Sequence, residues 1–221
     1  MRAAQAVTTA SAVARYLLAD AARSQRVILP FVVQVGVLAV LFGGDPGPLP
    51  APWGVSCLTA YPVAAWLALT VANTEDPVQR SVTVAAAGGP GPVAAGTLLA
   101  ALVGDLLLTV LSVGWGAVTT PHADPTTIAT GTLAHLAATV TGTALGLLCA
   151  RPLVPRIGWS LLVGAIVVIA TAVQPWLPPV GAAIAVLVDG RGPAALVVPA
   201  ALAFVLAVGA TVVSVVAARR A

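Results

Sequence analysis

Six runs of apolar residues, each ended by polar residues or by proline and glycine, follow one another along the chain. Most of them approach the roughly 20 residues that an apolar helix needs to cross the hydrocarbon core of a bilayer. The pattern predicts an all-α integral membrane protein that forms a single transmembrane domain over residues 1–221. The six predicted transmembrane helices cover residues 27–42, 53–72, 93–118, 128–150, 157–173 and 194–218.

The segment before the first span, residues 9–25, has an amphipathic pattern. Val13, Tyr16, Leu17 and Ala21 recur at helical spacing, and charged residues separate them. Such a pattern is typical of an interfacial helix that lies on the membrane surface. We therefore predict an N-terminal elbow helix here, with a frayed tail as the alternative.

The loop between the second and third spans has the signals of a short helix over residues 74–87. Thr74 is a suitable N-cap, and Glu75 and Asp76 follow in the first turn, where the helix dipole favours negative charge. The glycine- and proline-rich residues 88–92 end this helix and lead into the third span.

This short helix has one weakly apolar face. Val78, Val82 and Ala85 are spaced for one side of a helix, and Arg80 lies on the polar side. A loop that only joins two spans needs a few residues. The segment is therefore predicted to bind a partner, with a solvated helix that has no partner as the alternative.

The connection between the last two spans, residues 174–193, is interrupted near its start by Pro175, Pro178 and Pro179 and has Trp176 at the expected headgroup depth. Residues 180–188 within it are apolar but too few to cross a bilayer. The pattern predicts a re-entrant or broken segment at the outer side. An ordinary interfacial helix is the alternative.

Composition narrows the class of protein. The chain has 59% hydrophobic and 8% charged residues, whereas a soluble domain has about 25% charged residues. This argues against a soluble enzyme and against nucleic acid as a partner, and it predicts contact with membrane lipid. No catalytic site and no cluster of metal ligands is recognisable in the sequence.

The arginines predict the orientation. With a cytoplasmic N-terminus, nine of the ten arginines lie on the cytoplasmic side and only Arg191 lies outside. Since positive charge is enriched in cytoplasmic loops, both termini are expected in the cytoplasm. The chain has no lysine and is rich in alanine, valine and arginine, which suggests a high-GC bacterial genome and a multi-pass protein of the bacterial plasma membrane.

Two titratable residues lie within predicted spans. Asp105 in the third span and His135 in the fourth are expected at similar depths, so an intramembrane Asp105–His135 pair is one hypothesis. The alternative is a neutral Asp105 that is bonded to a hydroxyl group such as that of Ser112 or Thr139.

Other residues of the spans are candidates for packing or for a substrate path. Gln34 is expected to hold helices together or, with Trp176, to line a path for substrate. Gly142 and Gly146 form a Gly-x-x-x-Gly pair that permits close helix approach.

The order of these elements resembles the membrane subunit of ABC-2 type exporters. Family members often have an acidic residue at the start of the coupling segment, then a proline-containing turn and small residues at the start of the third span. The matching residues here are Glu75-Asp76, Pro90-Gly91-Pro92-Val93 and Gly96-Thr97-Leu98.

The resemblance implies a permease that exports a hydrophobic or amphipathic small molecule, peptide or lipid-like compound by alternating access. It implies that Glu75, Asp76, Val78, Arg80 and Val82 couple the chain to a cytoplasmic ABC ATPase. A second permease copy or a homologous permease would complete a dimer. Without lysine the chain has no P-loop motif, so ATP and Mg²⁺ are expected on the partner ATPase.

Two other functions stay open at this point. An ion-coupled secondary transporter or channel could use Asp105 and His135, and inverted internal repeats would then be expected. An integral-membrane enzyme or assembly factor is disfavoured because the chain has few polar side chains.

Overall fold

The computed structural model describes residues 2–120, 123–154, 156–172, 174 and 176–220. The secondary structure of these residues is helical, as predicted. The elements are α1 (Arg2–Ser24), α2 (Ile28–Phe42), α3 (Pro52–Ala72), α4 (Pro77–Ala86), α5 (Pro90–Thr119), α6 (Pro125–Cys149), α7 (Ile157–Ala172), α8 (Val180–Val188), the 3₁₀ helix η1 (Pro193–Leu196) and α9 (Val197–Ala218).

Four of the described helices are long and apolar enough to cross a membrane: α3, α5, α6 and the continuous η1–α9 unit. A fifth span results if α1 and α2 are counted together, although the two helices meet at an angle of 73°. α7 is apolar but shorter. These helices support a membrane-embedded protein, and the count of six spans stays a prediction.

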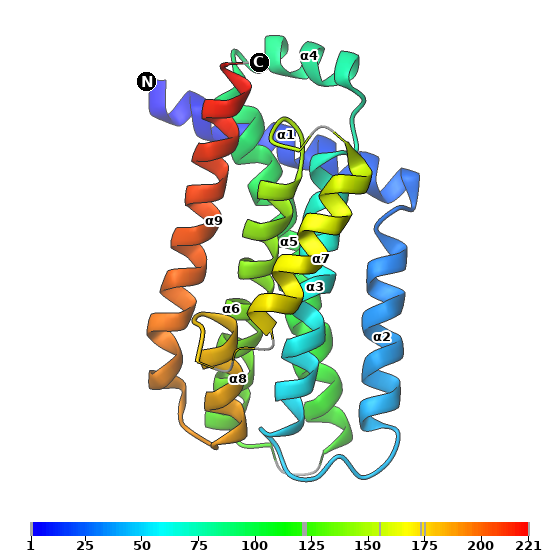
Figure 1. Ribbon diagram of the computed structural model, residues 1–221, viewed down its shortest axis with the longest axis vertical. Coiled ribbons are helices and arrows are strands. Elements are labelled where there is room, and N and C mark those ends of the chain that lie inside the picture. Colours follow the sequence, from blue (N-terminus) through cyan, green and yellow to red (C-terminus); the bar gives the residue numbers. More distant parts are fainter. Residues whose placement is uncertain (1, 121–122, 155, 173, 175, 221) are drawn as a thin grey trace.

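Most of the helices run side by side, and two helices lie across one end (Figure 1). α1 and α4 cross this end, where both ends of the chain also lie, and we call it the α4 end. The opposite end, where α8 leads into η1 and α9, is called the α8 end. The orientation of α1 agrees with the predicted elbow helix, which begins earlier than expected, at Arg2.

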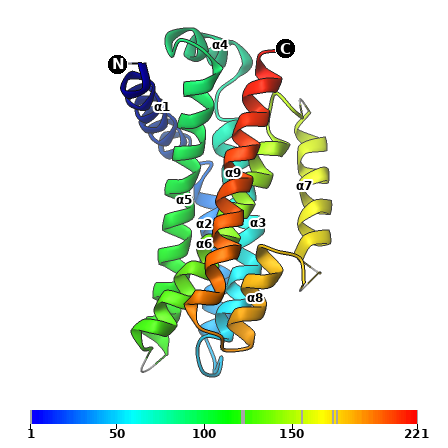
Figure 2. The ribbon, with the colours of Figure 1, turned by 90° about the vertical axis from the view of Figure 1, so that its left-hand side faces the viewer.

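α7 and α8 follow one another along the bundle. α7 begins near the α4 end and stops part of the way down, and α8 continues from there to the α8 end (Figure 2). The bounds of α8, Val180–Val188, are those of the predicted short apolar segment. α8 continues in the direction of α7 and does not fold back toward its starting end, and whether the two helices together cross the membrane stays a prediction.

Close contact between α3 and α6 forms the centre of the bundle. A methyl group on Gly142 would lie 2.3 Å from the carbonyl oxygen of Tyr61, and one on Gly146 would lie 2.4 Å from that of Ala65. The predicted function of the Gly-x-x-x-Gly pair as a close-approach site is thus confirmed. Gly131 makes similar room for the Trp53 ring, which a methyl group there would approach within 2.5 Å.

The outer helices are much more exposed than this centre. In the most apolar stretch of α6, 72% of the residues are buried, compared with 28% in the η1–α9 unit. The exposed side chains of α9 are mainly valine, leucine and phenylalanine. An apolar surface of this extent is favourable in lipid and unfavourable in water.

We predict that Gly142→Ala lowers the free energy of unfolding by about 1–3 kcal/mol, because the added methyl group must displace the α3 backbone. Gly209→Ala is the matched control, since Gly209 of α9 has no heavy atom within 4 Å of the added carbon. Thermal unfolding of both variants in detergent measures the difference. Equal stability of the two variants would contradict the proposed close contact.

Candidate functional site

α4 is capped by Asp76. Its Oδ1 accepts hydrogen bonds from the two backbone N–H groups that follow Pro77, at 2.8 and 2.9 Å. The prediction that Thr74 is the N-cap is wrong, because the Thr74 hydroxyl donates to the carbonyl oxygen of Thr70 in α3 at 3.0 Å. Pro77 favours an extended residue before it, and this places Asp76 at the cap.

Polar contacts fix the start of α4 and join the helix to α1. Glu75 is buried at 3% exposure, and one of its carboxylate oxygens accepts a hydrogen bond from Thr83. The other oxygen lies 3.8 Å from Nη1 of Arg80. The Gln79 amide donates to the Tyr16 hydroxyl, so α4 is also joined to α1.

Arg80 lies in a positively charged region at the α4 end. Burial lowers the pKa of Arg80, the Glu75 carboxylate opposes this effect, and the neighbouring Arg151 adds to it. Arg80 and Arg151 share a small pocket with Thr211 and Ser214 of α9. The predicted coupling residues therefore contact the inner part of this end as well as its surface.

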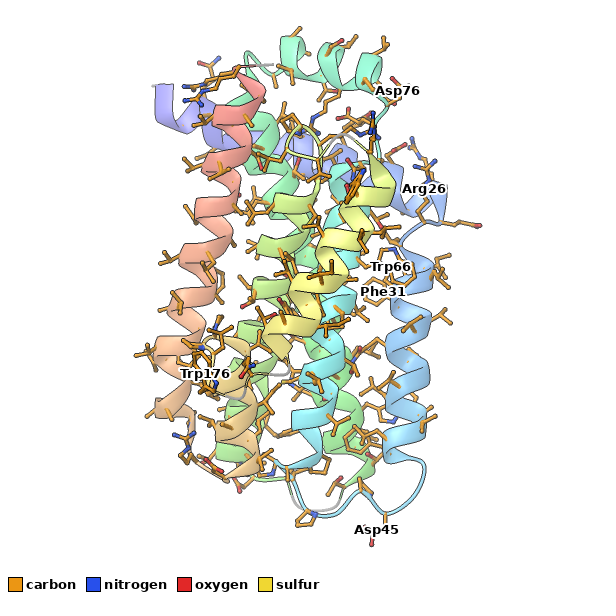
Figure 3. The ribbon with its side chains drawn as sticks, viewed as in Figure 1. Arg26, Phe31, Asp45, Trp66, Asp76 and Trp176 are labelled. Atoms are coloured by element: carbon orange, nitrogen blue, oxygen red, sulfur yellow. The ribbon has the colours of Figure 1, made fainter. Side chains whose placement is uncertain are left out.

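Two apolar residues of the predicted α4 face point outward, whereas Val84 packs inward. Val78 is 73% exposed and Val82 is 64% exposed. Val82 also lines a groove of about 420 Å³ between α1 and α4, together with Thr9, Ala12, Val13, Tyr16, Gln79, Thr83, Ala86 and Ala87. Asp76 marks the position of this surface, at the opposite end of the molecule from Asp45 (Figure 3). An exposed apolar face next to a groove is suited to binding another protein.

The predicted Asp105–His135 pair does not form. Asp105 is buried, and its Oδ1 accepts a hydrogen bond of 3.0 Å from Thr143. His135 lies 2.7 Å from the Ser56 hydroxyl through Nε2 and 2.8 Å from the Gly131 carbonyl through Nδ1.

The reason is the register of α5 and α6. The two helices are antiparallel, and the Asp105–Thr143 bond places these two residues at the same level. Counting from this bond to the end of α5 at Thr119 reaches residue 129 of α6, one turn after α6 begins. His135 therefore lies about 12 Å along α6 from Thr143. The alternative of a hydroxyl partner for Asp105 holds, but the partner is Thr143 and neither Ser112 nor Thr139.

The two residues predicted for a substrate path lie far apart in the fold. Gln34 is fully buried, and its amide donates to Ser112 at 3.0 Å, so it joins α2 to α5 as predicted for a packing residue. Trp176 is 74% exposed at the outside of the bundle, and its indole N–H donates to Gln174 at 2.9 Å.

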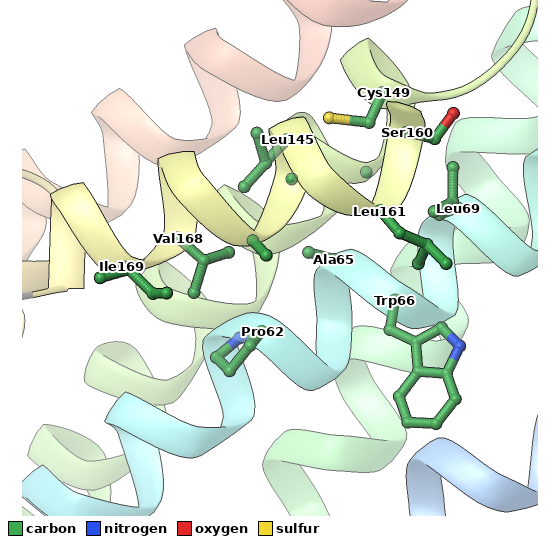
Figure 4. Close-up of a pocket in the computed structure, with 13 residues that line it drawn as sticks. Pro62, Ala65, Trp66, Leu69, Leu145, Cys149, Ser160, Leu161, Val168 and Ile169 are labelled. Atoms are coloured by element: carbon green, nitrogen blue, oxygen red, sulfur yellow. The ribbon is translucent and has the colours of Figure 1, made fainter. Parts of the chain in front are cut away.

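A cavity that the sequence did not predict lies beneath α7 (Figure 4). It has a volume of about 310 Å³, it is lined by α3, α6 and α7, and it is partly open to the outside of the bundle. The lining residues are Pro62, Ala65, Trp66, Leu69, Leu145, Gly146, Cys149, Ser160, Leu161, Gly164, Ala165, Val168 and Ile169.

A second cavity of about 180 Å³ lies where α7 ends and α8 begins. It shares Leu145 with the first cavity, and it contains a hydrogen bond of 2.9 Å between the hydroxyl groups of Tyr61 and Thr171. Apolar walls with few polar groups are suited to a hydrophobic or amphipathic ligand.

The described residues include no group of three or more His, Cys, Asp or Glu side chains that could hold a metal ion. Cys57 and Cys149 are both free thiols. Comparison of the chain with protein-family models, with curated proteins and with solved structures finds no match. Interpretation of the site therefore depends on its geometry.

We predict that Thr143→Val lowers the free energy of unfolding by about 1–3 kcal/mol, because Asp105 loses its hydrogen-bond partner inside the bundle. Thr141→Val is the matched control, since the Thr141 hydroxyl bonds only to the Ala137 carbonyl of its own helix. Thermal unfolding at neutral pH compares the two. A Thr141 variant that loses as much stability would contradict a specific bond to Asp105.

Proposed function

We propose that the chain is the membrane subunit of an ATP-driven, ABC-2-like exporter. The observation that carries this proposal is α4, a capped helix that lies across one end of the bundle with Val78 and Val82 exposed. A helix in this position can receive a push from a cytoplasmic ATPase, which would bind ATP and Mg²⁺. A second permease copy would complete the complex.

The charge distribution supports a cytoplasmic α4 end. The elements at or next to this end contain nine of the ten arginines, at positions 2, 15, 23, 26, 80, 151, 156, 219 and 220. Arg191 belongs to the opposite end, where it lies 3.3 Å from Asp189. This asymmetry agrees with the positive-inside rule and with a bacterial plasma membrane protein.

Contacts of α4 provide a route for movement into the bundle. α4 follows α3 directly through Glu75 and Asp76, and the Gln79–Tyr16 bond joins it to α1. α1 in turn packs closely on α5, where a methyl group on Gly96 would lie 2.6 Å from Val13. Displacement of α4 would therefore reach three elements of the bundle, as alternating access requires.

The cavity beneath α7 supports the substrate class. Its lining is apolar apart from Ser160 and Cys149, so a hydrophobic or amphipathic compound is favoured over a strongly charged one. Rocking of α7 would open or close this space.

A second candidate function is ion-coupled transport. It is favoured by Asp105, because the second carboxylate oxygen of this buried residue has no hydrogen-bond partner. His135 bonds to Ser56 and the Gly131 carbonyl, so it supports this alternative less than expected.

Cross-linking tests the exporter proposal. With Cys57 and Cys149 replaced by alanine, we expect Val82→Cys to cross-link in native membranes to a protein that has a P-loop ATPase sequence, because Val82 lies on the exposed face of α4. Mass spectrometry identifies the cross-linked protein.

Val118→Cys is the control, since Val118 is 88% exposed but lies near the α8 end. It should give no such product. Cross-linking of Val82→Cys only to proteins without a P-loop, or to none, would overturn the proposed coupling.

A further inference from the structure

Unpaired polar atoms inside the described part of the chain are concentrated along α5. Six buried side-chain atoms have no hydrogen-bond partner, and only Oε2 of Glu75 lies away from this helix. The other five are Asp105 Oδ2, Thr109 Oγ1, Gln34 Oε1, Trp53 Nε1 and Thr120 Oγ1. Buried polar atoms normally have hydrogen-bond partners, so several unpaired atoms beside one helix indicate that these residues have a function.

These atoms follow one face of α5. Residues three or four apart share a side of a helix, and the face in question contains Asp105, Thr109, Ser112, Gly116 and, just after the helix, Thr120. Gln34 is bonded to Ser112, and Nε1 of Trp53 lies 2.3 Å from the position of a methyl group on Gly116. The series extends from the middle of α5 to the α8 end.

Thr109 differs from most threonines of this chain. Hydroxyl groups of threonines in the helices commonly donate to the carbonyl four residues earlier, as Thr97, Thr130, Thr139, Thr171 and Thr211 do. The Thr109 hydroxyl has no such bond, and Asp105 with its unpaired oxygen lies one turn away. No hydrogen bond joins these two atoms directly, so a water molecule between them would be needed to pair both.

We propose that this face of α5 is a proton path from the α8 end to Asp105. A proton enters near Thr120, passes along hydroxyl groups and water molecules, and binds the Asp105 carboxylate to form a neutral carboxylic acid. Since the Trp53 indole only donates hydrogen bonds, it orients water and transfers no proton itself. The Gln34 carbonyl accepts a hydrogen bond from the same water chain.

The path ends at Asp105. Toward the α4 end, the next polar residue on α5 is Thr97, whose hydroxyl is bonded to the Val93 carbonyl, and Ala100 and Ala101 lie between them. A metal ion needs a shell of ligands, and a proton does not. The space beside Gly104, the residue next to Asp105, is filled by Leu67, so a proton is favoured over a metal ion. Asp105 is thus a proton-binding site that opens to one side.

Few other titratable groups face this site. α6 contributes His135, whose two ring nitrogens already have partners, and α3 contributes Cys57 and Tyr61. α2 and α9 have no charged residue between their bounds, and α1 contacts α5 near Gly96, on the far side of Asp105. The proposal does not depend on coupling to an ATPase.

Infrared spectroscopy of the purified protein in lipid nanodiscs tests the path. At neutral pH we expect a carbonyl band of a protonated carboxyl group that Asp105→Asn removes and Asp45→Asn, at an exposed carboxylate, retains. Thr109→Val should shift this band because the carboxyl group loses the polar hydroxyl one turn along α5. In D₂O, the band should exchange roughly tenfold more slowly in Gln34→Leu and Ser112→Ala, as expected when one hydrogen-bonded step is lost.

Thr97→Val is the control on the same helix, and it should leave the exchange rate unchanged. Absence of the band in the unmodified protein would overturn the proton site. Exchange that is equally fast in all variants, or slowed as much by Thr97→Val, would overturn the path along this face. Thr109→Val keeps the test valid if Asp105→Asn does not fold.

Discussion

The rest of the structure depends on how closely α3 and α6 approach. Backbone atoms of α3 occupy the space that side chains at Gly142 and Gly146 would fill. This contact fixes the distance and register of the two central helices, because in lipid close packing and polar contacts replace the hydrophobic effect as the force between helices. The contacts of α6 with α5 are set in turn, including the level at which Thr143 meets Asp105.

Local sequence signals predicted the elements well. The prolines and glycines around residues 180–188 gave the bounds of α8, and the glycine pair of α6 gave a close-approach site. The start of α4 was misplaced because Thr74 and Asp76 are both good caps, and the choice between them was made by Pro77 and by a hydroxyl bond back to α3. A local capping pattern does not encode that bond back to α3.

Prediction of the interior was less successful because it depends on register. The predicted depths of Asp105 and His135 assumed that the end of α5 and the start of α6 lie at the same level. In the structure α6 is displaced along α5 by about one turn, so Asp105 meets a different partner. The identity of Asp105, His135 and Gln34 as buried polar residues was correct. The cavity beneath α7 depends on the spacing of three helices, and no local pattern of residues encodes it.

Pro62 gives α3 uneven mechanical stiffness. Without an N–H group it leaves the Leu58 carbonyl without its usual partner in the helix, so α3 resists bending least at this turn. The same turn borders the cavity beneath α7 and lies beside the contact with Gly142. Strain applied to the α4 end of α3 would therefore be relieved as a change in the width of this cavity, before it reached the α8 end.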